Sequence, residues 1–252
     1  MSSGLALGAG PFAQAPAVIT SDRSRPAIDF GVSAGPSGSD RAIVWAHVDR
    51  PSRMVVEYAA GANRMRRVRG SVATPVTGLT ALTEIGDLPA GRQISYRVYF
   101  EDLDGGRTTS APEPGTITTR RERHQAVRIA WSADVCGQGW GIDTARGGMR
   151  LFNTMLGMRP DLFVHVGDTI YADGPLREEV MLDDGTVWRN IVTPAKSKVA
   201  ETLDEFRGNH LYNRLDEHYR RFAAQVGQVV MWDDHEVRDN WFHEQVLPAQ
   251  AP

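Results

Sequence analysis

Three short segments in the second half of the chain hold the side chains that could do chemistry together. They supply carboxylates, a thiol, a phenol, an imidazole, a guanidinium and an amide: Asp134, Cys136, Asp168, Tyr171, Asp234, His235, Arg238 and Asn240. Carboxylates packed together repel one another unless cations lie between them. Oxygen ligands suit hard divalent cations, whereas a thiolate and a phenolate favour a stronger Lewis acid because both must lose a proton to bind. The segments therefore predict a mixed site in which two cations, about 4 Å apart, clamp a phosphoryl group and generate hydroxide near neutral pH.

Each of these segments follows a run of apolar residues that is typical of a buried strand, at 126–131, 162–166 and 228–232. A short helical pattern precedes the second run, and the spacing of apolar residues predicts helices over 195–207 and 211–224. Strands that alternate with helices indicate a parallel sheet with helical crossovers. Because the carboxyl ends of parallel strands meet at one edge of a sheet, we expect the three segments to converge there.

Each residue also has a plainer interpretation when it is taken alone. Cys136 is typical of a small buried residue, Tyr171 of a core residue and Asp134 of a cap. His165 lies inside a predicted strand, and we interpret it as a core histidine. The coincidence of such residues at three strand ends favours the functional interpretation.

The first half of the chain has a different pattern. Apolar and polar residues alternate over 94–100, and turn signals separate several short apolar runs. Short antiparallel strands at regular spacing predict a β-sandwich, in which no acids, histidines or thiols converge. We therefore divide the chain into a leader at 1–25, a β-sandwich domain at 26–120 and an α/β region at 126–252.

The composition excludes several classes of protein. The 252 residues carry a net charge of −3, which does not indicate a nucleic-acid-binding surface, and the single cysteine rules out an internal disulfide. The sequence has no run of 18 apolar residues, so we expect no membrane span. It also lacks the serine-hydrolase elbow and the phosphate-binding glycine motifs. Residues 13–15 have the small-x-small form of a signal cleavage site, but the leader has no charged start, so an export-signal remnant and a disordered tail both stay open.

These motifs together resemble the PhoD-like alkaline phosphatase/phosphodiesterase family of the metallophosphoesterases. The blocks Gly-Asp-x-Ile-Tyr at 167–171 and Asp-Asp-His-Glu-Val at 233–237 form a specific combination, and segments 136–140, 185–190 and 198–207 also match. The resemblance implies hydrolysis of phosphate monoesters or diesters by a binuclear centre, with metal-bound hydroxide as the nucleophile. It also implies Fe³⁺ and Ca²⁺, with other divalent cations as alternatives, in a secreted or periplasmic protein. The implied fold is a fibronectin-III-like sandwich followed by part of a four-layer α/β/β/α metallophosphoesterase domain.

The resemblance assigns roles to the first two segments. Asp168 would be the carboxylate that bridges both cations, and Tyr171 would be a phenolate ligand of iron. Cys136 would be the thiolate ligand, with Asp134 as a competing assignment because Asp134-Val-Cys136 has the spacing of the superfamily's Asp-x-His motif.

It assigns roles to the third segment as well. Asp234 or Asn240 would bind the second cation. His235 would orient the phosphate or protonate the leaving group, and Arg238 is a candidate phosphate contact.

The sequence departs from the family pattern at its carboxyl end. Metallophosphoesterases draw further ligands from the second half of the domain, whereas here only His243 and Glu244 follow the third segment as candidates. We therefore expect the amino-terminal part of a longer protein. The alternative to an active phosphatase is a catalytically incompetent fragment that acts as a binding module and self-associates through an exposed sheet edge.

Overall fold

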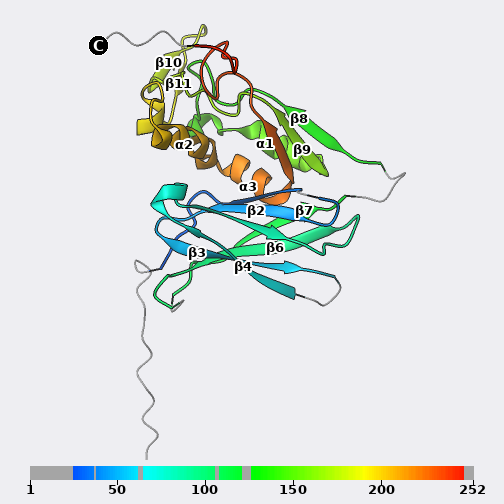
Figure 1. Cartoon of the computed structure of the whole chain (residues 1–252). Helices are drawn as coiled ribbons and strands as arrows, with labels where there is room; N and C mark the ends of the chain where they lie inside the picture. The colour runs from blue at the N-terminus through cyan, green and yellow to red at the C-terminus, as the bar shows by residue number, and fades with distance from the viewer. Residues whose placement is uncertain (1–24, 37, 62–64, 106–107, 121–125, 247–252) are drawn as a thin grey trace, which may run out of the picture.

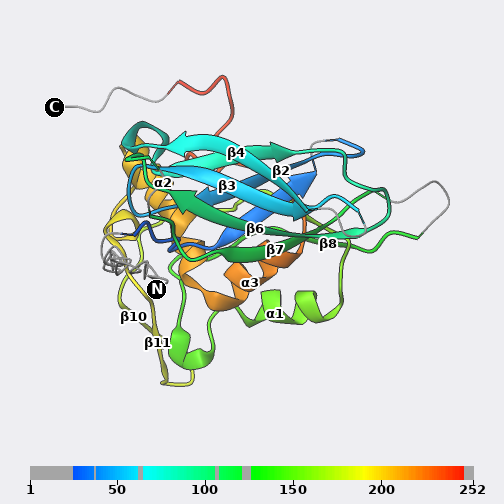
Figure 2. The ribbon, with the colours of Figure 1, turned by 90° about the horizontal axis from the view of Figure 1, so that it is seen from below.

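Seven strands of the first half form two antiparallel sheets that face each other (Figures 1 and 2). The computed structural model describes residues 25–36, 38–61, 65–105, 108–120 and 126–246. One sheet has the order β1 (Val32–Pro36), β2 (Ala42–His47), β5 (Thr80–Ile85). The other has the order β4 (Met65–Ala73), β3 (Ser52–Ala59), β6 (Gln93–Glu101), β7 (Glu113–Thr118).

The alternation along β6 explains why the two sheets pack together. Ile94, Tyr96 and Val98 are buried in the shared core, whereas Ser95 and Arg97 between them are exposed. Successive side chains of a strand point to opposite faces, so this sequence presents one apolar face to the opposing sheet.

Three parallel strands organise the second half. Their order is β12 (Gln228–Met231), β9 (Leu162–Val166), β8 (Ile129–Ser132). Two helices, α1 (Arg150–Gly157) and α3 (Glu217–Gln225), cover one face of this sheet. There Phe163 of β9 packs edge-to-face on Phe152 and Phe222, with ring centroids 6.2 Å and 5.1 Å apart.

The opposite face of the parallel sheet carries exposed apolar side chains: Ile129, Trp131, Val229 and Met231. Trp131 is 70% exposed, although it lies in the middle of a strand. The sheet is therefore packed on one face and open on the other within the described part of the chain. None of the described helices is both long enough and apolar enough to span a membrane.

Two further elements complete the second half. The helix α2 (Leu203–Tyr212) leads through a 3₁₀ turn, η5 (Asn213–Leu215), to α3. A small hairpin, β10 (Glu179–Met181) and β11 (Val187–Arg189), turns at residues 183–185.

The helix α3 lies between the sandwich and the parallel sheet (Figures 1 and 2). The hydroxyl of Thr116 in β7 donates a hydrogen bond to the carbonyl of Gln225 at 3.0 Å. Just before α3, the guanidinium of Arg214 lies 4.0 Å from the ring centroid of Trp45, and it donates to the Ser33 hydroxyl at 2.9 Å. These contacts fix the sheet that carries the candidate site on the sandwich.

Close backbone approach tightens the same interface. A Cβ added to Gly35 of β1 would lie 2.6 Å from the carbonyl oxygen of Gln228 in β12. Only glycine allows the two strands to come this near, because such a contact is far shorter than carbon and oxygen tolerate.

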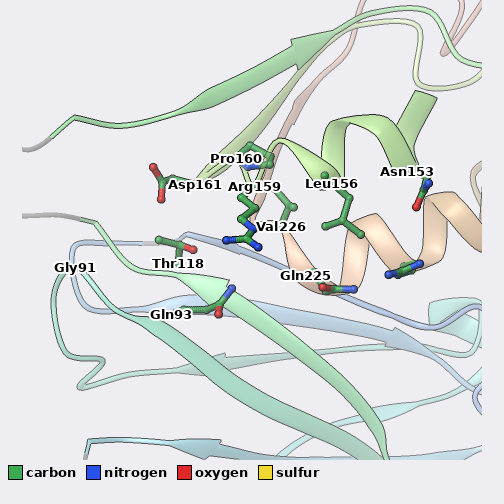
Figure 3. A pocket seen from close by; sticks show the side chains of 12 residues that line it. Gly91, Gln93, Thr118, Asn153, Leu156, Arg159, Pro160, Asp161, Gln225 and Val226 are labelled. Carbon is green, nitrogen blue, oxygen red and sulfur yellow. The ribbon is translucent and has the colours of Figure 1, made fainter. Parts of the chain in front are cut away.

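Beside this interface, a cavity of about 670 Å³ lies between the sandwich and the helices α1 and α3. Gln93, Arg159 and Gln225 line it (Figure 3).

The predicted helices differ from the observed ones in their bounds. The prediction of a helix over 195–207 was wrong for its first turns, because Pro194–Lys196 forms an isolated 3₁₀ turn, η4, and α2 begins at Leu203. Thr202 and Glu205 build a reciprocal capping box that sets this start. The prediction over 211–224 was wrong in its continuity, because Asp216 is an N-cap and starts α3 after a break.

Candidate metal centre

The loops that follow β8, β9 and β12 meet at one end of the parallel sheet. The backbone N–H of Val135 donates to the carbonyl of Asp168 at 3.1 Å, which joins the first two loops. The N–H of Ala172 donates to the carbonyl of His235 at 2.9 Å, which joins the second and third. The sheet topology thus brings together three segments that are separated by about thirty and sixty residues in the sequence.

Asp168, Asp234 and His235 form the centre of this convergence. Each offers one ligand atom, and these atoms all lie within 4.8 Å of one another. The backbone N–H of His235 also donates to Oδ1 of Asp168 at 3.4 Å. The two carboxylates at this spacing can hold a cation beside the imidazole.

Tyr171 and Cys136 lie beside this centre, in the first two loops. The Tyr171 hydroxyl donates to Oδ1 of Asp134 at 2.7 Å, so these two predicted ligands are in direct contact. With Cys136, they line a recess of about 390 Å³ that also contains Trp140. A Cβ at Gly137 would lie 2.2 Å from the Tyr171 ring, so a side chain at this position would displace the phenol.

Backbone strain is concentrated in these loops. The φ angles are positive at Asp134, Cys136, Gln138, Asp168 and Asn240, with values between +50° and +58°. Non-glycine residues rarely adopt this left-handed region, and the surrounding structure must enforce it. The strain indicates that the loops are held in one arrangement, as a preformed ligand site requires.

Burial raises the pKa values of three side chains at the site. Burial, together with the neighbouring Asp134, raises the pKa of Asp168 to about 6, although Tyr171 and His235 partly oppose the shift. Burial also raises the pKa of the Cys136 thiol to about 12 and that of Tyr171 well above its usual range. Cys136 and Tyr171 therefore hold protons that a bound cation would displace, and the ionised form of Asp168 is one that a cation would stabilise, so the donor set suits cations.

The imidazole of His235 is held between two carboxylates. Burial alone would lower its pKa, but the hydrogen bond to Asp173 and the charge of that carboxylate raise it. Nδ1 of His235 lies 2.8 Å from Oδ1 of Asp173, and Nε2 lies 3.6 Å from Oδ1 of Asp239. The ring also stacks on Tyr171 with centroids 4.4 Å apart.

The remaining residues of the third loop are arranged differently. The backbone N–H of Asn240 donates to the carboxylate of Asp234, while its side-chain amide donates to Asp239 at 2.9 Å. Burial alone would raise the pKa of Asp234, but the hydrogen bond from the Asn240 N–H and the charge of His235 lower it. Arg238 is exposed, and no residue in the described part of the chain forms a hydrogen bond or ion pair with its side chain. The structure therefore places Asp234 at the centre and Arg238 at its periphery.

Comparison with known proteins identifies the family. A model described as "PhoD-like phosphatase, N-terminal domain" matches residues 13–121, and one described as "PhoD-like phosphatase" matches residues 129–251. The chain belongs to the PhoD-like phosphatase family. Alkaline phosphatase D of Bacillus subtilis (strain 168) is 28% identical over 227 residues, covering 84% of this chain and 36% of the relative. The chain thus spans little more than a third of that curated relative.

Two solved structures share the fold. The structure of PhoD superposes with a TM-score of 0.68 and 24% identity, covering 90% of this chain and 43% of the other. The purple acid phosphatase PPD1 from yellow lupin (Lupinus luteus) seeds superposes with a TM-score of 0.51 and 11% identity, covering 83% and 35%. These two superpositions show that the PhoD-like chain shares their fold.

The sequence analysis missed a buried carboxylate that ties the loops of this PhoD-like chain together. Glu236 is 2% exposed and accepts hydrogen bonds from the backbone N–H of Thr169 at 2.5 Å, from its hydroxyl at 2.6 Å and from the N–H of Asp233 at 2.9 Å. It therefore positions the second loop against the third. Its place beside His235 was the one available signal, but the sequence does not reveal which donors it meets.

Lys196 was missed as well. This lysine is 2% exposed, and its Nζ donates to the carbonyl of Tyr171 at 3.0 Å. Burial lowers its pKa to about 8, although Cys136 and Asp173 oppose the shift. Lys196 therefore holds the backbone of the second loop at Tyr171.

Proposed function

We propose that this chain provides part of a binuclear metal centre that hydrolyses phosphate monoesters or diesters. The observation that carries the proposal is the convergence of Asp168, Asp234 and His235 within 4.8 Å, in a chain of a phosphatase family. The raised pKa of Asp168 supports it, since crowded carboxylates of this kind are relieved by cations.

The donor set divides between two cations. We assign Asp168 as the bridging carboxylate, and Tyr171 with Cys136 as ligands for Fe³⁺, with Asp134 as the competing first-loop ligand. Asp234 or Asn240 would hold Ca²⁺. When bound, the cations supply charge stabilisation for the phosphoryl oxygens and a nucleophilic water.

His235 would supply the proton for the leaving group. Its Nδ1 is engaged by Asp173 at 2.8 Å, which fixes the ring, and Nε2, which lies 3.6 Å from the exposed carboxylate of Asp239, would be the donor toward substrate. A pKa raised by Asp173 keeps this imidazole protonated closer to neutral pH, as a general acid requires. Arg238, exposed beside the third loop, would contact the phosphate.

The finer features of the fold belong to the same proposal. The sandwich, with three strands in one sheet and four in the other, supports a fibronectin-III-like assignment. The parallel sheet, packed on one face and open on the other, supports part of a four-layer α/β/β/α domain. Export to the periplasm or the medium follows by analogy with the family, and the leader on which it depends lies almost wholly outside the described residues.

The proposal is tested by metal content and turnover. Elemental analysis of protein purified without chelator should give iron and a second cation near stoichiometry, with hydrolysis of a phosphate monoester or diester. Asp168→Asn should lose both, whereas Asp183→Asn, in the exposed hairpin turn, should keep both. Equal metal content and turnover in wild type and Asp168→Asn would refute the assignment.

One observation favours a second role, as an interaction module. The strand β8 is a sheet edge, and its outward residues Ile129 and Trp131 are 53% and 70% exposed. We propose that this edge self-associates. Sedimentation velocity should show larger species at higher protein concentration, and Trp131→Lys should remove them while Val76→Lys on the sandwich should not. A wild-type protein that sediments as one species at all concentrations would contradict this role.

A further inference from the structure

An exposed tryptophan stands at the mouth of the candidate centre. Trp140 lines the same recess as Asp134, Cys136 and Tyr171, and it is 43% exposed. This large indole is packed on one side and open to water beside polar side chains on the other, and aromatic side chains placed in this way are typical of recognition surfaces.

The loop that carries Trp140 is held rigidly. Trp140 packs edge-to-face on Trp188, with ring centroids 5.8 Å apart at 86°. The indole N–H of Trp188 donates to Oδ1 of Asn190 at 2.9 Å and to the carbonyl of Gly141 at 3.2 Å. Asn190 in turn accepts from the N–H of Gly141 at 2.7 Å and donates to the carbonyl of Gly139 at 2.9 Å, on either side of Trp140.

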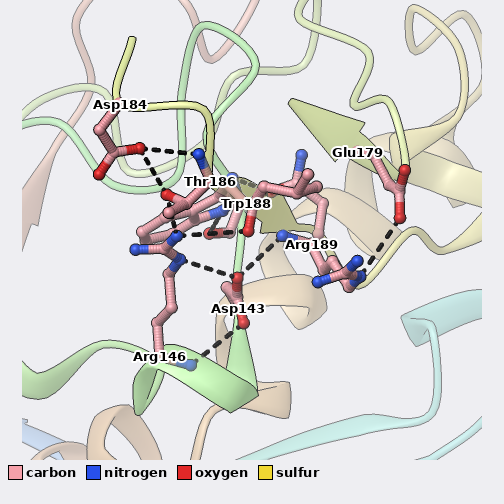
Figure 4. Close-up of polar contacts among 10 residues, drawn as sticks. Asp143, Arg146, Glu179, Asp184, Thr186, Trp188 and Arg189 are labelled. Carbon is pink, nitrogen blue, oxygen red and sulfur yellow. Dashed lines mark hydrogen bonds and ion pairs between the residues drawn. The ribbon is translucent and has the colours of Figure 1, made fainter. Parts of the chain in front are cut away.

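A second layer fixes Trp188 from behind (Figure 4). The guanidinium of Arg146 lies 5.7 Å from the Trp188 ring centroid and donates to the Thr186 hydroxyl at 2.7 Å. Buried Asp143 accepts from the backbone N–H of Arg146 at 3.2 Å and from that of Arg189 at 2.8 Å. Arg146 therefore holds Trp188 in place, and Trp188 holds Trp140. The position of the Trp140 indole is set before any ligand binds.

We propose that Trp140 forms a leaving-group subsite that stacks on a planar aromatic ring carried by the alcohol part of the phosphate ester. This inference rests on the proposed function and narrows its substrate class to esters whose leaving alcohol bears a flat ring, such as a nucleobase. Preorganisation matters here because a fixed aromatic surface loses little conformational freedom when it binds. Stacking of a base on an aromatic side chain changes affinity by about tenfold.

The experiment compares two substrates that differ only in the ring. Adenosine 5′-monophosphate and ribose 5-phosphate have the same kind of leaving oxygen, so the ratio of their kcat/KM values reports the ring and not the chemistry. We expect wild type to favour the nucleotide by about tenfold. Trp140→Ala should bring the ratio near one, Trp140→Phe should keep most of the preference, and Val76→Ala, at an exposed position on the sandwich, should leave it unchanged.

The possible outcomes distinguish failure of the Trp140 subsite from failure of the proposed phosphatase activity. An unchanged ratio in Trp140→Ala, with both substrates still hydrolysed, would overturn the subsite and leave the phosphatase intact. If Trp140→Ala does not fold, Trp140→Leu gives the same reading, since leucine is apolar but has no π face. If wild type hydrolyses neither substrate, the proposed function fails. Calorimetric titration with the same two ligands then decides the subsite: a nucleotide preference lost in Trp140→Ala supports it, and equal binding by wild type and variant overturns it.

Discussion

Replacement of Glu236 by glutamine should loosen the candidate centre without changing its shape. The carboxylate is buried and accepts three hydrogen bonds, two from Thr169 in the second loop and one from the N–H of Asp233 in the third. Glutamine has the same size but only one acceptor oxygen. If that oxygen stays with Thr169, the amide NH₂ must face the N–H of Asp233, and two donors then oppose each other.

The magnitude follows from the bonds that are lost. A hydrogen bond to a charged group contributes about 1.5 to 3 kcal/mol, and an unpaired buried donor costs a similar amount. Glu236→Gln loses one such bond and weakens two, so we expect the free energy of unfolding to fall by about 2 to 3 kcal/mol. Since Glu236 positions the loops that carry Asp168 and His235, metal affinity should fall by about tenfold or more.

The assay pairs urea unfolding with metal titration. Glu244→Gln is the matched control, because this side chain is 78% exposed in the same terminal segment. The control should stay within about 0.5 kcal/mol of wild type. A Glu236→Gln variant that is as stable as the control would refute the view that this carboxylate joins the loops.

Three further predictions concern the structure around the site. Arg214→Met should lower the free energy of unfolding by about 2 to 3 kcal/mol in urea titrations, because the interface loses a stacked guanidinium and its hydrogen bonds, and an unchanged midpoint would contradict this. Gly35→Ala should lower the melting temperature because its Cβ meets the Gln228 carbonyl, whereas Gly157→Ala, which meets nothing, should leave it equal or higher. Asp143→Asn should destabilise at pH 7 by about 1 to 2 kcal/mol. The pKa of Asp143 is lowered by hydrogen bonds from Arg189 and Arg146, so its contribution is complete above about pH 4 and is lost as the pH falls through its folded pKa. The difference in free energy of unfolding between wild type and Asp143→Asn should therefore be smaller at pH 3 than at pH 7. An equal difference at both pH values would contradict this prediction.

Strands were easier to predict than helix bounds, for a physical reason. The apolar run 162–166 coincides with β9, because alternate side chains of this strand, Phe163 among them, must pack against α1 and α3. The start of α2 depends on Thr202 and Glu205, whose side chains satisfy the free N–H groups of the first turn. That signal was present in the sequence, but the spacing of apolar residues alone extended the helix upstream to 195.

The site was predictable only in part. The rule that parallel strands end at one edge was enough to gather Asp168, Asp234 and His235 from distant positions. It could not place Glu236 or Lys196, since their partners are mostly backbone groups whose positions depend on how the loops close. The periodicity of apolar residues shows which face of a helix or strand is buried, whereas these contacts depend on how the loops pack against one another.

The position of α3 implies that the whole described chain melts as one unit. Phe222 of this helix belongs to the core of the parallel sheet, while Ala224, two residues later, packs on the core of the sandwich. Loss of the contact with α3 would expose part of the core of either half. Unfolding of one half alone is therefore unfavourable for the other. Calorimetry should therefore record a single transition, with a van't Hoff enthalpy equal to the calorimetric one. A ligand bound at the loop end of the sheet would, through the same helix, raise the temperature at which the distant sandwich unfolds.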